Sequence, residues 1–196
     1  YLERKGSFVA RQDNFEKIPG APVAYWVSEA VFEAFTKGIV MGKLAEPRQG
    51  MSTCDVDYFT REWYEVEISK TNVEKNEKNK KWIKYNKGGA YRKWYGNREN
   101  LVLWNNDCDL LLKKGALLRN KDVYFKKFIA WTKISSAGTG FRWFEDNFLF
   151  DGAGGSLFIA SEDLNEYYCV ALLNSSPIRM ILDIISPTLN YNENHI

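Results

Sequence analysis

The chain has 196 residues, of which 45% are hydrophobic and 15% aromatic, and its formal net charge at pH 7 is +2. This composition excludes a disordered tail and predicts a globular protein with one good core or two small ones. No run of about 18 apolar residues occurs, and the first residues lack the apolar block of a signal peptide, so we expect a cytoplasmic protein without a membrane span. Because the numbered chain opens on Tyr1, we also expect a piece of a larger protein.

The cysteine and histidine residues limit the chemistry that the chain can support. Cys54, Cys108 and Cys169 are odd in number and far apart, which argues against a disulfide framework and against a Cys-x-x-Cys metal site. His195 is the only histidine, so His-based triads and His-rich metal sites are excluded. We therefore expect free thiols, no metal site and no histidine-based catalysis.

The first predicted element is a helix that begins after Ser28 and ends at Gly38. Ser28 is a suitable N-cap, and Val31, Phe32 and Phe35 fall on one helical face. We interpret this segment as a packing helix.

The next segment is predicted to contain a strand at residues 44–48, a polar turn at residues 49–53 and a second strand at residues 58–68. Arg48 and Gln49 can each form a bidentate pair with a base edge, and Ser52 and Thr53 suit contacts with phosphate. These residue types indicate a nucleic-acid contact at the turn, although an ordinary exposed loop has the same composition.

A basic stretch follows, in which residues 70–98 carry ten Lys or Arg against two Glu. Its local charge is +8, whereas the rest of the chain carries −6. Residues 82–98 interleave aromatic and basic side chains around Gly88 and Gly89, which allow a close backbone approach to a ligand. Cations near phosphates release counterions and aromatic planes stack on bases, so the pattern is typical of a polyanion-binding surface. The alternative is a solvated β-hairpin whose lysines protect an edge strand.

The expected structure of this stretch is a loop followed by a β-meander. Residues 71–81 are polar throughout and predict a mobile loop that links two strands. Alternating residues around the turn sites at 87–89 and 96–97 predict further strands with their charge on one face.

Two short helices are predicted next, at residues 105–112 and 121–128. Asp107 and Asp109 invite a metal or acid–base interpretation. Capping and the helix dipole explain acidic residues at the start of a helix equally well, and no third carboxylate or lysine completes a nuclease-like site nearby.

From residue 129 the chain is again predicted to be rich in strands, at residues 129–134, 141–144, 148–151 and 156–159. Ser135, Ser136 and Arg142 form a second polar set that is predicted to contact nucleic acid. The glycines of residues 152–155 lack the Gly-Lys-Ser/Thr ending of a P-loop and the Gly-x-Gly-x-x-Gly spacing, so we interpret them as a tight, buried chain crossing.

The last block predicts a pair of helices, at residues 164–173 and from Pro177 to about residue 185. Together the elements predict an α+β fold. Its mixed or antiparallel sheet contains a β-meander or hairpins and is flanked by short helices and the C-terminal helical pair. We expect a single domain over residues 1–196, with residues 162–196 as a helical cap.

Five blocks of sequence also occur in an order that matches one protein family: FEKIPGAPVAYWVSE, PRQGMSTCDVDYFTREWYEV, KWIKYNKGGAYRKWYGN, ISSAGTGFRWF with FDGAGGSLF, and LLNSSP with ISPTLNYN. They resemble the region downstream of the catalytic domain in large adenine-specific DNA methyltransferases. The closest resemblance is to the methyltransferase of BREX phage-exclusion systems, with related regions in fused restriction–modification enzymes. It covers residues 15–192.

This resemblance implies a target-recognition domain, which selects the adenine that is presented for methylation. In the family an N-terminal domain binds S-adenosylmethionine, and an Asn-Pro-Pro-Tyr or Asn-Pro-Pro-Phe motif receives the flipped adenine. No Asn-Pro-Pro or Asp-Pro-Pro occurs in this chain, so the resemblance implies that catalysis and the cofactor belong to another part of a parent methyltransferase, with or without a fused type II restriction endonuclease. The implied partners are double-stranded DNA and the parent's N-terminal methyltransferase domain.

The family's motifs fall on positions that the charge pattern also selects, at residues 48–50, 86–89, 92–97 and 135–136. The residues predicted to contact DNA are Arg48, Gln49, Ser52, Thr53, Lys84, Lys87, Tyr91, Arg92, Lys93, Trp94, Ser135, Ser136 and Arg142. Among them the predicted base readers are Arg48, Gln49 and Arg142, and the predicted phosphate or groove contacts are Lys87, Arg92 and Lys93. Tyr91 and Trp94 suit packing as well as stacking. The chain departs from the family at residues 54–57, where Cys-Asp-Val-Asp replaces the usual Gly or Asn.

Two other functions stay open at this point. One is a structural domain whose aromatic surface docks onto the parent's methyltransferase domain or another defence subunit. The other is a nuclease that uses Asp107, Asp109 or Glu145.

Overall fold

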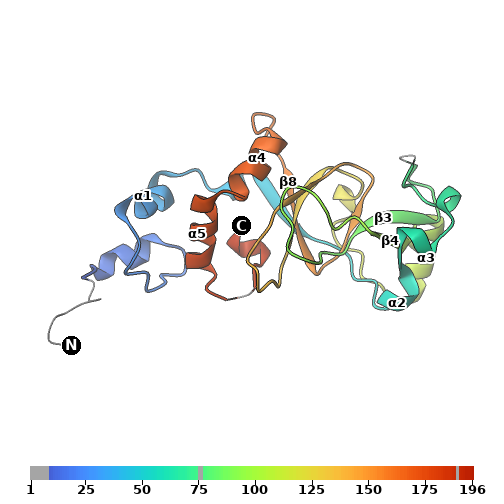
Figure 1. Cartoon of the computed structure of the whole chain (residues 1–196), viewed down its shortest axis with the longest axis horizontal. Coiled ribbons are helices and arrows are strands. Elements are labelled where there is room, and N and C mark those ends of the chain that lie inside the picture. The colour runs from blue at the N-terminus through green and yellow to red at the C-terminus, as the bar shows by residue number, and fades with distance from the viewer. Residues whose placement is uncertain (1–8, 75–76, 189) are drawn as a thin grey trace.

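The structure is a computed structural model that describes residues 9–74, 77–188 and 190–196, without the side chains of residues 105–107 and 195. The molecule is elongated. Helix α1 (Glu29–Lys37) lies at one end, α2 (Val56–Phe59) and α3 (Asn105–Lys113) lie at the other, and β8 (Gly154–Ile159) lies between them (Figure 1). Short 3₁₀ helices occur at Gln12–Lys17, Met41–Lys43, Trp63–Glu65, Ile68–Lys70, Lys121–Val123 and Glu193–His195.

The first sheet is antiparallel and has the strand order β1-β8-β5-β6. Its other members are β1 (Ala45–Gln49), β5 (Phe128–Thr132) and β6 (Arg142–Phe144). The register places one row of side chains across all four strands: Arg48, Ser156, Ala130 and Arg142. Two of the predicted base readers therefore lie at opposite edges of the same row.

The second sheet is mixed and has the order β2-β4-β3-β7. Strands β2 (Thr60–Glu62), β4 (Asn100–Leu103) and β3 (Trp82–Asn86) pair antiparallel, whereas β7 (Leu149–Phe150) runs parallel to β3. The two small sheets and the helices confirm the α+β class.

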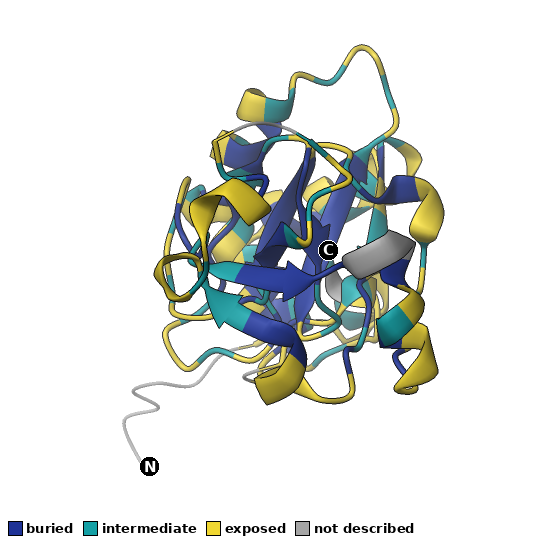
Figure 2. Ribbon diagram, turned by 90° about the vertical axis from the view of Figure 1, so that its right-hand side faces the viewer, coloured by how far each residue is buried: buried dark blue, intermediate teal, exposed yellow. Residues whose placement is uncertain are grey.

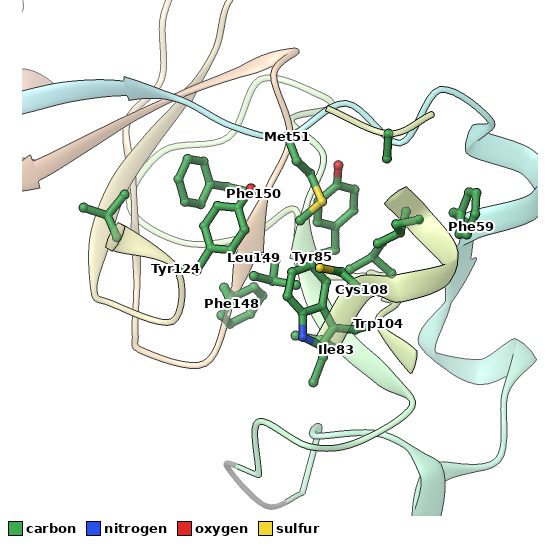
Figure 3. Close-up of a cluster of buried hydrophobic side chains, with 14 of the residues drawn as sticks. Met51, Phe59, Ile83, Tyr85, Trp104, Cys108, Tyr124, Phe148, Leu149 and Phe150 are labelled. Atoms are coloured by element: carbon green, nitrogen blue, oxygen red, sulfur yellow. The ribbon is translucent and has the colours of Figure 1, made fainter. Parts of the chain in front are cut away.

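Buried side chains from both sheets meet in one hydrophobic cluster. Ile83, Tyr85 and Val102 come from the second sheet, and Phe128 and Phe158 come from the first. The close-up in Figure 3 labels ten residues of this cluster, and Figure 2 shows buried strands surrounded by exposed loops and helices. The alternation of side chains along β5 sends its other residues into a second cluster, beneath the C-terminal helices.

The helical predictions at both ends of the chain are confirmed. Helices α4 (Glu166–Leu173) and α5 (Ser176–Ile185) lie where the last block predicts them, and Asn165 caps α4 by accepting hydrogen bonds from two backbone N–H groups. In α1, Val31 and Phe32 are buried and pack with Ile184 of α5. Within the described residues no single helix is long and apolar enough to span a membrane; α4 and α5 pass such a test only as a pair, which is bent by 63°.

Four local predictions are wrong. Residues 58–68 form α2, the short strand β2 and two 3₁₀ turns in place of one strand, because Asp55 caps α2 and Glu62 forms a capping box with Glu65. Residues 121–128 contain one 3₁₀ turn, since Phe125 has a φ of 62° that ends it, and β5 begins at Phe128.

The third error is the β-meander. Strands β3 and β4 are antiparallel neighbours joined by one long loop, residues 87–99, without further regular strands. Positive φ angles at Gly88, Gly89, Trp94, Gly96 and Asn97 interrupt any extended conformation there. The fourth error is the polar turn predicted at residues 49–53. The chain is extended there, and Met51 and Ser52 form isolated bridges with Asp151 and Leu117.

Candidate nucleic-acid interface

Two segments that the sequence selects separately lie against each other. Loop 87–99, which joins β3 to β4, packs along the segment that ends in β6. The Trp94 amide donates to the Phe141 carbonyl at 2.9 Å, and the Trp94 carbonyl accepts from the Trp143 amide at 3.1 Å. An added Cβ at Gly140 would lie 2.6 Å from the Arg92 carbonyl oxygen, so this close approach requires glycine. The loop thus extends the row that ends at Arg142.

Arg142 holds this contact from below. Its side chain is fully buried and donates to the carbonyls of Arg92 (3.3 Å) and Gly140 (3.2 Å) and to the Thr132 hydroxyl (3.3 Å). Burial and the charge of the neighbouring Arg92 lower the pKa of Arg142 to about 10, so it remains a cation at neutral pH. We expected this side chain to read bases, but the structure places it beneath the surface, where it organises two loops.

Two further cations of the basic stretch are engaged beneath the loop. Lys84 and Arg98 both pair with Glu145, the former at 3.5 Å, and all three side chains are largely buried. The Lys84 ammonium also lies 4.8 Å from the centre of the Phe148 ring. Glu145, a candidate for the nuclease interpretation, is thus the counter-ion of two cations, and Lys84 has a structural position that its residue type does not reveal.

The remaining cations of loop 87–99 differ in their accessibility. Lys93 donates to the Asn174 carbonyl at the C-terminal end of α4, at 3.0 Å, where a cation is favoured by the helix dipole. Arg92 pairs with Glu99 at 3.0 Å but keeps half of its side chain exposed. Lys87 makes no ion pair among the described residues and lines a shallow pocket of about 260 Å³ that also includes the acidic Glu62.

The residues of the first predicted contact set, at positions 48–53, differ in their exposure to solvent. Gln49 is exposed, and Arg48 is partly exposed and pairs with Glu46 while donating to Asn120 at 3.4 Å. Ser52 is half-buried, and Thr53 is buried. Arg48 and Gln49 can thus reach a ligand from the surface, whereas Thr53 cannot.

The glycine residues connect these sites. An added Cβ at Gly152 would lie 3.6 Å from the Gln49 amide nitrogen, and one at Gly88 would lie 3.9 Å from the Ala153 carbonyl oxygen. Residues 152–153 therefore lie between Gln49 and loop 87–99. Gly154 and Gly155 are the buried first residues of β8, whereas Gly152 is half-buried and Ala153 is exposed, so only the second half of this run is buried as predicted.

The serines of the second predicted contact set, Ser135 and Ser136, lie on the loop that precedes β6. Ser135 is half-buried and Ser136 is exposed, and both belong to the loop that leads to Gly140 and Arg142. Tyr91 is half-buried, and its ring lies against Gly140. The structure thus brings Tyr91, Arg92 and Trp94 beside the segment that carries the serine residues.

Sequence reasoning missed two residues of this surface. Tyr95 is 67% exposed, and its ring centre lies 4.0 Å from the Arg98 guanidinium carbon. Its place in the aromatic and basic run could have indicated it. Asn120 donates to the Gln49 carbonyl at 2.9 Å and thereby fixes the end of β1, but 71 residues separate the two and no sequence signal marks them.

The described residues offer little for metal or redox chemistry. They contain no group of three or more His, Cys, Asp or Glu side chains that could hold a metal ion. Cys54 is an exposed free thiol and Cys169 a buried one, and burial raises the pKa of Cys169 to about 11. The described residues form an α+β scaffold that presents a loop surface of aromatic, basic and hydroxyl side chains.

Comparison with known proteins identifies relatives of this chain. No protein-family model matches the chain. It is 39% identical over 182 residues to the adenine-specific methyltransferase BrxX of Escherichia coli O9:H4 (strain HS), and 36% identical over 194 residues to the adenine-specific methyltransferase PglX of Lacticaseibacillus casei (strain Zhang). Each match covers 92% of this chain but only 15% and 16% of the respective relative. The resemblance to BREX-type adenine-specific methyltransferases is therefore confirmed, and the chain corresponds to a small part of their length.

Proposed function

We propose that this chain is the DNA target-recognition module of an adenine-specific methyltransferase in a phage-defence or restriction–modification system. The observation that carries the proposal is the contact of loop 87–99 with residues 140–143, which follow the segment of Ser135 and Ser136, because the composition of both segments independently suits DNA contact. The similarity to a small part of two adenine-specific methyltransferases supports it.

The accessibility of each cation decides which residues we assign to DNA. Exposed ion pairs contribute only about 0–1 kcal/mol, so a phosphate can replace Glu99 at Arg92 or Glu46 at Arg48. The bonds of the buried Lys84 and Arg142 are much harder to exchange, because their partners would lose them inside the protein, and the half-buried Lys93 donates to the carbonyl of the buried Asn174. We therefore assign phosphate contacts to Lys87, Arg92, Ser135 and Ser136, and base contacts to Arg48 and Gln49.

Catalysis belongs, in this proposal, to another part of the same polypeptide. A base-flipping methyltransferase needs a pocket for the extruded adenine and a site for S-adenosylmethionine, and the chain has no Asn-Pro-Pro motif for the former. The module acts as one unit over residues 1–196, in the cytoplasm, with the N-terminal methyltransferase domain and duplex DNA as its partners.

A protein-docking function is the second candidate. It is favoured by the internal pairing of most cations in the basic stretch and by exposed apolar side chains near α1. Trp26, Met180 and Ile184 line a pocket of about 350 Å³ between that region and α5. Docking onto the methyltransferase domain would need no free positive charge, whereas DNA binding does.

Binding of duplex DNA across a salt series separates the two functions. We expect affinity to fall steeply with salt, and Lys87→Ala and Arg92→Ala each to weaken binding to all sequences alike and to reduce the slope of log K against log salt by about 1. Gln49→Ala should instead change the preference among sequences, by about 1–3 kcal/mol.

Lys37→Ala is the matched control, because Lys37 is an exposed, ion-paired lysine on α1, outside the proposed surface. An affinity that does not change between low and high salt, or variants that all behave like Lys37→Ala, would contradict DNA recognition and favour docking.

A further inference from the structure

Trp94 differs from the other exposed tryptophans in its backbone. Its φ is 70°, in the left-handed region that bulky side chains rarely adopt. A conformation of this kind persists only where its surroundings hold it in place, and such residues cluster at functional sites. Glycine would adopt it without strain, yet the chain has the largest side chain at this position.

Three hydrogen bonds hold this segment. The amide and carbonyl of Trp94 bond to Phe141 and Trp143 on either side of Arg142, at 2.9 Å and 3.1 Å. The buried Arg142 side chain binds the Arg92 carbonyl two residues earlier. The backbone is thus fixed between an edge strand and a buried cation, so the direction of the Trp94 Cα–Cβ bond is set before any ligand arrives.

The Trp94 indole packs only partly against the protein. It is 52% exposed, whereas Trp131 in the adjacent sheet is fully buried. The next residue, Tyr95, is 67% exposed, and its ring faces the Arg98 guanidinium. Two aromatic rings therefore project from a rigid, strained turn next to the cation Arg92.

We propose that Trp94 stacks on the face of a nucleobase at a place where the DNA stack is opened. This inference rests on the proposed function and names the chemistry of one contact within it. Extrusion of an adenine leaves a gap between its neighbours, and an exposed indole on a fixed backbone can fill such a gap without rearrangement of the main chain. Stacking of a base on an aromatic side chain is also tolerant of sequence.

The test uses fluorescence anisotropy with two labelled duplexes of the same sequence, one intact and one with a single central abasic site. The wild-type chain should prefer the abasic duplex. Trp94→Ala should lose this preference, with a roughly fivefold to hundredfold weaker affinity for the abasic duplex, while Trp94→Phe retains most of it. Trp26→Ala is the control, because that indole is 58% exposed beside α5.

A stability measurement separates stacking from a structural role. Trp94→Gly should melt at a higher temperature than Trp94→Ala, because glycine relieves the strain at positive φ, yet both should bind the abasic duplex equally weakly. Binding by Trp94→Ala that equals the wild type would overturn the stacking role alone. Absence of binding to either duplex by the wild-type chain at low salt would overturn the proposed function together with it.

Discussion

Glu145 illustrates how single side chains of the basic stretch are committed to the fold. Burial raises the pKa of Glu145, but the hydrogen bond and charge of Arg98, with the charge of Lys84, outweigh it and leave the pKa below its usual value. A carboxylate with a lowered pKa stabilises the folded state at pH values above its pKa in the unfolded chain, which is about 4.3. This stabilisation is lost as the pH falls through the lower pKa of the folded state.

We expect Glu145→Gln to lower the free energy of unfolding at pH 7 by about 1.5–3 kcal/mol, the cost of losing hydrogen bonds to charged groups. The difference from wild type should shrink as the pH falls from the unfolded-state pKa of about 4.3 through the lower pKa of the folded state. Urea unfolding at a series of pH values measures both effects.

Glu33→Gln serves as the control, because Glu33 forms an exposed pair with Lys37 on α1 and should change stability by less than about 0.5 kcal/mol. Equal effects of the two substitutions at pH 7 would show that the Glu145 cluster contributes no more than a surface pair.

At this scale the sequence indicated which segments contain the surface but not which side chains reach it. Charge and aromatic content selected residues 82–98, and a separate polar set selected Ser135, Ser136 and Arg142, but the sequence did not show that the two segments touch. Arg142 and Lys84 are buried and Lys93 is half-buried, through partners between 10 and 81 residues away, and residue type carries no information about such partners.

At the scale of elements, the packing of β8 against β5 depends on one glycine. An added Cβ at Gly155 would lie 2.0 Å from the Trp131 ring, which is fully buried and donates a hydrogen bond from its indole nitrogen to the Tyr191 carbonyl at 2.7 Å. The ring cannot move without disturbing the C-terminal segment that it binds.

Gly155→Ala should therefore destabilise the protein by about 1–3 kcal/mol through overpacking, as measured by urea unfolding. Gly42→Ala is the matched control: nothing lies within 4 Å of its added Cβ, and its φ is not positive. A Gly155→Ala protein as stable as Gly42→Ala would mean that β8 can shift away from Trp131.

The elements that could be predicted are those with strong local signals. Helix α5 has Pro177 in its first turn, where proline is favoured, and α1 has a clear apolar face. The strand predicted at residues 58–68 is wrong because local capping by Asp55 and Glu62 overrides the strand propensity of this segment. The β-meander predicted around loop 87–99 is wrong because the alternation of residues there resembles that of a strand. The positive φ angles of the loop and its pairing with Phe141 and Trp143 depend on residues far away in the sequence.

For the whole molecule, β5 unites two cores. Phe128 and Ala130 pack in the cluster shared with the second sheet, while Ile129 and Trp131 face the C-terminal helices. Neither core can be lost without exposing one face of this strand, so the two should unfold together.

We expect Ile83→Ala in the first cluster and Leu157→Ala in the second each to lower the free energy of unfolding by about 2–5 kcal/mol within a single transition. Far-UV and near-UV circular dichroism should report the same midpoint in urea. Leu112→Ala, at a residue that is 50% exposed, is the control and should have a small effect. Separate transitions in either core variant would indicate two independent folding units.

The strand order has a consequence for the synthesis of the protein. Strand β1 pairs only with β8, about 110 residues later, and β3 takes its parallel neighbour β7 from beyond residue 148. On the ribosome, β1 must therefore wait, unpaired, until most of the chain has emerged, and β3, which can pair early with β4, must wait as long for its second neighbour. Non-local pairing of this kind folds slowly and exposes strand edges in the meantime. The nascent chain thus stays vulnerable to aggregation, and to capture by chaperones, until β8 has left the exit tunnel.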